Sequence, residues 1–283
     1  MRWSWRLGRI SGIEVNVHWT FLLLLVWIGL SGLFSGGPLG SVANLVAILI
    51  VFGIVVLHEL GHAFAARYYG IPTRDITLLP IGGVARVARM PDNPRQELVV
   101  AAAGPAVNLV LAGTATMGLY LAGSLGPSTF AMVASVLLGW FVWANLALAI
   151  FNLIPAFPMD GGRILRAALA QRLSYLKATD IATRVGRFLG IAIGIYGLVS
   201  FTVTLMLIGA FVWFGATQEM LMVKARSMGF FSPLPGQPQT GAMGGEPYPP
   251  QPSSHHPPAQ AGYTVIRGPL GNVITVVRNF RLP

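Results

Sequence analysis

The segment FGIVVLHELGHAFAARYYG, residues 52–70, places two histidines and a glutamate near the end of an apolar run. An apolar run of roughly 20 residues is long enough to cross a membrane. Each ionisable side chain at membrane depth costs about 2.5–3.5 kcal/mol on the insertion scale, so such side chains are rare without a partner or a function. The segment therefore predicts a membrane-spanning helix that carries a polar site.

The composition of the whole chain is that of a membrane protein. Of its 283 residues, 54% are hydrophobic and only 10% are charged, whereas soluble domains carry about a quarter charged residues. We predict an all-α polytopic membrane protein with about six transmembrane helices, and a short membrane-associated β-hairpin near the active site. The six spans are expected at residues 17–34, 43–66, 98–122, 130–152, 184–200 and 202–222.

The basic residues separate to one side of these spans. The chain has 19 Lys and Arg against nine Asp and Glu, yet the loops near 35–42, 123–129 and 200–202 contain no charged residue. By the positive-inside rule, the basic N-terminus and the other basic segments face the cytoplasm. We therefore expect a multi-pass protein of the plasma membrane, embedded in the lipid bilayer with both termini cytoplasmic. Because topology accounts for the positive charge, no nucleic-acid partner is expected.

The chain changes character after the last span. Residues 1–227 are predicted to form the six-span domain, with a catalytic core at about 43–165. Residues 228–262 are rich in Pro, Gly, Gln and Ser, which is typical of a disordered linker. Residues 263–283 alternate apolar and polar residues around a GPLGN turn, which predicts a short cytoplasmic β-hairpin-like tail.

The histidines and the glutamate have the spacing of a zinc site. His58 and His62 lie four residues apart, so a helix presents them on one face. With Glu59 they form H-E-x-x-H, in which two histidines bind zinc and the glutamate acts as a general base. A structural zinc site returns an apparent ~10–16 kcal/mol at neutral pH, which more than offsets the burial cost. We predict one Zn²⁺ per chain; the absence of cysteine excludes thiolate ligands.

A catalytic zinc takes three protein ligands and leaves one position open. The residue at the spacing of a third histidine is Tyr68, and His18 is expected to be an interfacial or hydrogen-bonding residue. Asp160 follows span four in AIFNLIPAFPMDGGRIL, where two prolines break the helix at membrane depth. Asp160 is the preferred third ligand, with a helix N-cap as the alternative. The other carboxylates are expected in or beside basic, watery segments: Glu14, Asp75, Asp92, Glu97, Asp180, Glu219 and Glu246.

Four more residues are candidates for contact with a substrate. In ITLLPIGGVARV, residues 76–87, we expect a hairpin with Gly82 and Gly83 in its turn, whose edge pairs with an extended peptide. Asn152 is a candidate for holding a substrate backbone group or an oxyanion; alternatively, it ties down its own loop. Asn108 is expected to make an interhelical hydrogen bond, with a direct catalytic part as the alternative.

Two of these segments resemble the signatures of a known family. HELGH at 58–62 and N-x-x-P-x-x-P-x-D-G-G at 152–162 resemble the signatures of the site-2 protease family of intramembrane zinc metalloproteases, and GPAVN at 104–108 is similar to a third element. The resemblance covers residues 1 to about 225 and is to the prokaryotic type, without a PDZ or CBS domain. It implies a six-span bundle with spans two to four as its core. It also implies zinc on His58, His62 and Asp160, with Glu59 activating a water.

The function expected is therefore hydrolysis of peptide bonds within or near transmembrane segments of membrane-protein substrates, known as regulated intramembrane proteolysis. The alternative is a non-proteolytic zinc-binding membrane scaffold, against which Glu59 counts, because a closed structural site needs no base. An ion transporter would need polar residues along several spans, and spans one, five and six offer little beyond Ser and Thr. The sequence predicts neither the substrate nor an oligomeric state.

Overall fold

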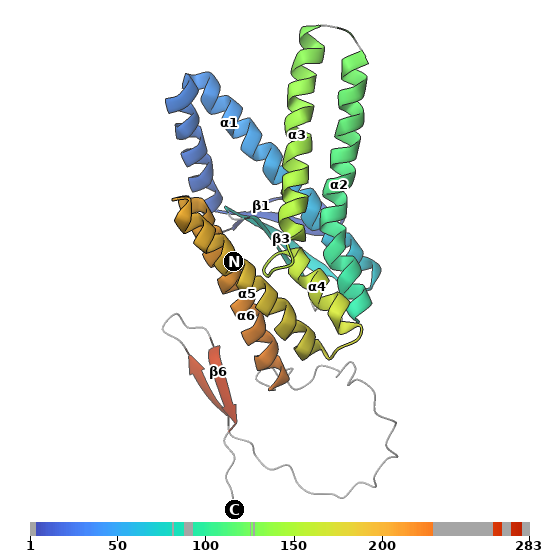
Figure 1. Cartoon of the computed structure of the whole chain (residues 1–283), viewed down its shortest axis with the longest axis vertical. Helices are drawn as coiled ribbons and strands as arrows, with labels where there is room; N and C mark the ends of the chain where they lie inside the picture. The colour runs from blue at the N-terminus through green and yellow to red at the C-terminus, as the bar shows by residue number, and fades with distance from the viewer. Residues whose placement is uncertain are drawn as a thin grey trace, which may run out of the picture. The chain divides into compact units, whose positions relative to one another are not determined.

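The computed structural model describes residues 4–80, 82–87, 93–124, 126, 128–228, 263–267 and 273–278 (Figure 1). The chain divides into two compact units, Met1–Ser232 and Pro233–Pro283. In the first unit, the elements follow one another as β1 (Ser4–Ile10), β2 (Ile13–His18), α1 (Thr20–Tyr68), β3 (Thr73–Leu79), β4 (Gly82–Val87), α2 (Pro94–Ser124), α3 (Thr129–Leu153), α4 (Asp160–Ala170), α5 (Tyr175–Val199) and α6 (Val203–Ser227).

Five helices of this unit, α1, α2, α3, α5 and α6, are long and apolar enough to cross a membrane. With 49 residues, α1 has a contour length of about 73 Å, more than twice the thickness of a bilayer core. It bends back at Gly36 and Gly37, where the φ of Gly37 is 63°, and its two arms are plain in Figure 1. A Cβ on Gly32 would lie 2.5 Å from the Gly40 carbonyl oxygen, so the arms touch at the bend. Because α1 is long enough to cross twice, the five helices together provide six spans, and the prediction of about six spans is confirmed.

The strands form one sheet in the order β1-β2-β3-β4, with β2 and β3 parallel and the other pairs antiparallel. The predicted hairpin is confirmed, but its turn was misplaced. Leu79 pairs with Gly82, so the turn, which contains Pro80, comes before Gly82, and Gly82 and Gly83 lie in β4. Proline suits this turn because it has no N–H to donate to a ladder.

The strands β1 and β2 were missed, and span one was started too early, at residue 17. The helix begins at Thr20, because the chain pairs as a strand up to His18. The signal for β2 is present in IEVNVH: Ile13, Val15 and Val17 alternate with polar residues and all three are buried, Ile13 and Val17 in clusters with side chains of α1. The fold is thus a helical membrane protein with a four-stranded sheet rather than an isolated hairpin.

One buried carboxylate holds this sheet together. Asp75, on β3, accepts hydrogen bonds from Arg86 Nη2 at 2.7 Å, Thr77 Oγ1 at 3.1 Å and Asn16 Nδ2 at 3.3 Å. Burial alone would raise the pKa of Asp75, but these hydrogen bonds hold it below its ordinary value. The expectation that Asp75 lies in a watery segment is therefore wrong, since its side chain ties β2, β3 and β4 together.

A second buried charge cluster lies around α4. Arg166 is fully buried and donates three hydrogen bonds, two to Glu97 of α2 and one to Glu219 of α6. The rings of Phe157 and Tyr175 each lie 5.0 Å from its guanidinium carbon. Glu97 is only 4% exposed, which corrects the expectation of a watery position for it. The local sequence is basic, but α4 folds back so that one arginine bridges α2 and α6.

The second unit contains β5 (Tyr263–Arg267) and β6 (Val273–Arg278), which pair antiparallel. Both strands fall in the segment for which a hairpin-like tail was predicted. Residues 229–262, which make up nearly all of the predicted linker, lie outside the described residues. The division of the chain into a six-span domain, a linker and a tail stays a prediction.

Candidate metal centre

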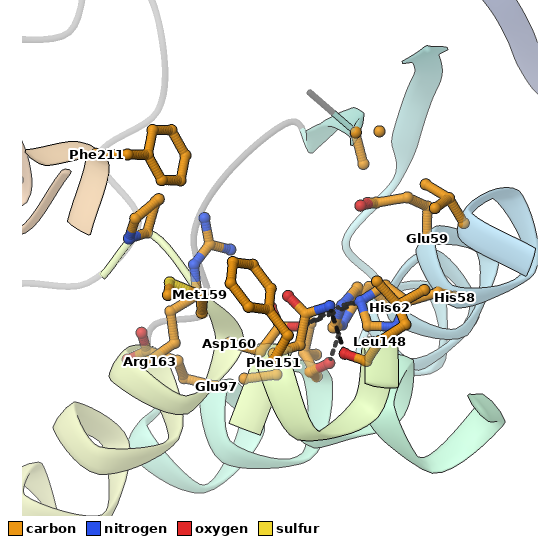
Figure 2. Close-up of a pocket in the computed structure, with 18 residues that line it drawn as sticks. His58, Glu59, His62, Glu97, Leu148, Phe151, Met159, Asp160, Arg163 and Phe211 are labelled. Carbon is orange, nitrogen blue, oxygen red and sulfur yellow. Dashed lines mark hydrogen bonds and ion pairs between the residues drawn. The ribbon is translucent and has the colours of Figure 1, made fainter. Parts of the chain in front are cut away.

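Three ligand atoms converge at one point inside the helices. His58 Nε2, His62 Nε2 and Asp160 Oδ2 lie 3.1 Å from one another in all three pairs (Figure 2). The histidines come from the second arm of α1, and Asp160 is the first residue of α4, about a hundred residues later. The structure thus brings the two segments singled out in the sequence into contact.

The arrangement fits a zinc ion. Tetrahedral coordination with bonds of about 2.0–2.2 Å places neighbouring ligand atoms about 3.3–3.6 Å apart, slightly more than the 3.1 Å between these atoms. Two imidazole nitrogens and one carboxylate oxygen form a donor set typical of catalytic zinc, which leaves a position open for water. The alternative role of Asp160 as a helix cap does not apply. Met159 occupies the N-cap position, and no side-chain capping hydrogen bond is formed there.

Helix α2 fixes the orientation of both histidine rings. Val100 O lies 2.7 Å from His62 Nδ1, and Asn108 Oδ1 lies 3.1 Å from His58 Nδ1. With an acceptor at each Nδ1, that nitrogen carries the proton and Nε2 keeps its lone pair for a metal. Asn108 therefore makes the expected interhelical hydrogen bond, and its partner is a candidate ligand. The part played by Val100 was missed, because a backbone carbonyl leaves no trace in the sequence.

Two glycines allow backbone to pass directly against these side chains. A Cβ on Gly104 of α2 would overlap the His62 ring and lie 2.8 Å from His58 Cε1. A Cβ on Gly83 of β4 would lie 2.7 Å from Glu59 Cγ. The GPAVN segment signalled the importance of Gly104 only through the family resemblance. Gly83, taken as a turn residue in the sequence, instead brings an edge strand against the glutamate.

The site opens into a cavity of about 400 Å³. Its lining includes every predicted site residue except Asn108: His58, Glu59, His62, Gly82, Gly83, Asn152 and Asp160. Asn152 Nδ2 donates to Leu148 O at 3.0 Å, a bond within α3 that does not reach the loop that follows, so neither expected role of Asn152 is shown. His18 lies elsewhere, at the end of β2, with Nδ1 2.8 Å from Thr20 Oγ1. Arg163 of α4 and Phe211 of α6 also line the cavity, and the sequence analysis missed both.

The chain is similar in sequence to known zinc metalloproteases. The model of peptidase family M50 matches residues 46–133 and 124–193. The chain is 40% identical to zinc metalloprotease MJ0392 of Methanocaldococcus jannaschii over 229 residues, covering 81% of this chain and 64% of the relative. It is 35% identical to putative zinc metalloprotease Rip3 of Mycobacterium tuberculosis over 245 residues, covering 81% and 61%. The chain thus spans somewhat more than six-tenths of the length of these curated relatives.

Among solved structures, the site-2 protease from Methanocaldococcus jannaschii matches with a TM-score of 0.54 and 37% sequence identity. The match covers 77% of this chain and 95% of that one.

Proposed function

Because the chain belongs to peptidase family M50 and shares the fold of a site-2 protease, we propose that it is an intramembrane zinc metalloprotease. Its reaction is the hydrolysis of peptide bonds within or near transmembrane segments of membrane proteins. The observation that carries this proposal is the convergence of His58 Nε2, His62 Nε2 and Asp160 Oδ2 beside Glu59, in one cavity among apolar helices.

Each residue has a defined part in this reaction. His58, His62 and Asp160 hold the zinc, while Asn108 and the Val100 carbonyl keep the imidazole rings aligned. A zinc ion held there would supply Lewis-acid chemistry, lowering the pKa of a water toward 7 and polarising a peptide carbonyl. Glu59 accepts the proton of the attacking water and delivers it to the leaving amine.

The proposed site lies below the membrane surface, nearer one face. Nine residues of helix separate His58 from Arg67, which corresponds to about 13 Å. Arg67 donates to Ser11 O at 2.9 Å, which anchors this end of α1 to the β1–β2 turn. With the basic segments on the cytoplasmic side, both termini face the cytoplasm and the site opens toward it.

A helical substrate must unwind, because its scissile carbonyl is otherwise engaged in helix hydrogen bonds. Strand β4 is one of the two edge strands of the sheet, and its residues Gly82, Gly83 and Ala85 line the cavity. An extended segment of the substrate adds to this edge as a further strand. Since Gly83 has no side chain, the added strand passes close to Glu59.

The test is made in the native host. Cells carrying wild-type protein, Glu59→Gln or the control Glu14→Gln, whose carboxylate pairs with Arg6 outside the cavity, are compared by mass spectrometry of membrane-derived fragments. We expect particular single-span proteins to accumulate uncut only in the Glu59→Gln cells. If all three fragment sets are the same at equal abundance of the protein, the proposal fails. A zinc-binding scaffold then becomes the better account.

A further inference from the structure

The cavity contains a cationic side chain that the mechanism so far leaves unused. Among the described residues that line it, Arg163 is the one arginine or lysine. Resting on the proposed function, we propose that Arg163 is a catalytic residue. Its guanidinium donates a hydrogen bond to the carbonyl oxygen of the scissile peptide bond as negative charge develops there.

Its place on α4 is what brings Arg163 to the reaction. Asp160 begins this helix, and Arg163 follows three residues later. Residues at this spacing are neighbours on one helix face, with Cβ atoms about 5–6 Å apart. Figure 2 shows both residues coming from α4 to the same cavity. The helix that supplies a zinc ligand thus also supplies a long cationic side chain one turn away.

The guanidinium of Arg163 is available for a ligand. Among the described residues, no hydrogen bond or ion pair engages it, and its side chain is exposed. Arg166, three residues further along α4, differs in both respects, since it is fully buried and bonded to Glu97 and Glu219. A guanidinium keeps its charge at every pH of interest and carries five N–H donors.

The other polar groups of the cavity are weaker candidates for this part. Nδ1 of each histidine is engaged by an acceptor on α2, and the Nε2 atoms face Asp160. The Asn152 amide already donates to Leu148 O, and its remaining N–H is neutral. Glu59, Glu97 and Asp160 are carboxylates and accept rather than donate. Arg163 is therefore the charged donor that the lining residues leave for a substrate.

The chemistry of hydrolysis calls for such a donor. When the oxygen of water bonds to the carbonyl carbon, a proton passes to Glu59 and the π-electron pair of the carbonyl moves onto its oxygen. Negative charge thus shifts from the Glu59 carboxylate to that oxygen. It returns when the carbon–nitrogen bond breaks and the amine leaves with the proton. A preorganised donor at that oxygen stabilises the transition state more than the bound substrate, and removing one typically costs on the order of 10²–10³ in kcat.

The test uses the purified, zinc-loaded full-length protein. The probe is a synthetic peptide with one apolar span and a fluorophore–quencher pair, selected because wild type cuts it and Glu59→Gln does not. The variants are Arg163→Met, Arg163→Lys and Arg163→Ala, the last being the one to which guanidinium ion is added. Arg172→Met is the matched control, since Arg172 is also exposed, follows α4 and does not line the cavity. Zinc content and thermal unfolding are measured alongside kcat and KM.

We expect Arg163→Met to lower kcat about 100-fold while KM, zinc content and melting temperature stay near wild type. Arg163→Lys should lose less, and Arg172→Met should match wild type. Added guanidinium ion at millimolar concentration should restore part of the kcat of Arg163→Ala. This rescue would not occur if Arg163 only stabilised the fold.

Three results would overturn the inference while leaving the protease proposal intact: an unchanged kcat in Arg163→Met, a rise in KM alone, or a loss of zinc. Each would be read against Glu59→Gln, which must remain inactive. If no peptide distinguishes wild type from Glu59→Gln, the protease proposal fails first, and the role of Arg163 falls with it.

Discussion

Two clusters of buried ionisable side chains share the short helix α4, and they are neutralised in opposite ways. The first is the His58–His62–Asp160 group, which opens into the cavity and in which, among the described residues, no lysine or arginine pairs with the carboxylate. The second joins Arg166 to Glu97 and Glu219 and carries its own cation. The first group needs an ion from outside, whereas the second is complete within the chain.

This difference indicates a division of labour along 11 residues of helix. The first residue of α4 belongs to a group of side chains that could hold a metal ion, and its seventh is bonded to both α2 and α6. A buried ion pair contributes little net stability compared with an apolar substitute, but losing one partner leaves the other charge uncompensated. The two clusters should therefore fail in different measurements when they are disrupted.

The largest effect is expected at the first cluster. Asp160→Asn removes the charged ligand, so we expect zinc to be lost and cleavage abolished while the helices stay folded. Metal content per chain, measured by elemental mass spectrometry, and circular dichroism in detergent check this. The control Asp180→Asn alters a partly exposed carboxylate paired with Arg184 on α5 and should leave both quantities unchanged. Full zinc occupancy in Asp160→Asn would remove Asp160 from the ligand set.

At the second cluster, the expected loss is in stability. Arg166→Met leaves two carboxylates without their cation, which typically costs about 3–5 kcal/mol. Thermal unfolding in detergent should show a clearly lower midpoint, and combining the change with Glu97→Gln and Glu219→Gln should recover part of it. Arg163→Met, on the same helix, is the natural comparison and should unfold like wild type. Equal midpoints for the two arginine variants would contradict the contrast between the clusters.

A smaller effect tests how closely α2 must approach the first cluster. Gly104→Ala places a methyl group against both imidazole rings, and such overpacking costs typically 1–3 kcal/mol. We expect weaker zinc binding in a chelator competition. Gly113→Ala, on the same helix with nothing within 4 Å of the added methyl group, should bind zinc normally and gain slight stability. Equal zinc affinities in the two variants would contradict the requirement that α2 approach the histidine rings closely.

The smallest effect concerns Asp75. Its cationic partner Arg86 is half exposed, so this pair is intermediate between the first cluster, which has no cation of its own, and the second, whose cation is fully buried. Since folding lowers the pKa of Asp75, its contribution is present above the unfolded value of about 3.9 and is lost as the pH falls through the folded value. Asp75→Asn should therefore cost about 1 kcal/mol at pH 7 and progressively less below pH 4. Denaturation midpoints against pH measure this. A constant difference would exclude the carboxylate charge as the cause.

The sequence was sufficient for the features that depend on local pattern. The lengths of the apolar runs predicted the membrane spans, and the spacing of His58, Glu59 and His62 predicted the first half of the site. Asp160 stood out because two prolines and two glycines surround it at membrane depth. Each of these signals is readable within about 20 residues of chain.

The features that depend on contacts between distant segments were the ones missed or misplaced. Glu97 was expected to be solvent-exposed because its buried partner, Arg166, lies 69 residues away in the sequence. Val100 acts through its carbonyl, which every residue has. The alternation of Ile13, Val15 and Val17 is a signal for the strand β2. Its neighbour β3 follows only after the 49 residues of α1, so the pairing of β2 with β3 was not evident from the sequence.

The bend in α1 has a consequence for the membrane itself. The arm from Thr20 to Ser35 rises about 24 Å, whereas the hydrocarbon core of a bilayer is about 30 Å thick. A span shorter than the surrounding lipid thins the bilayer beside it, at a cost of fractions of a kcal/mol per Å. The arm that follows is about twice as long and must tilt. A thinned rim along the first arm shortens the hydrocarbon path between the aqueous phase and the interior of the protein, so bilayers of longer acyl chains should slow the proposed proteolysis.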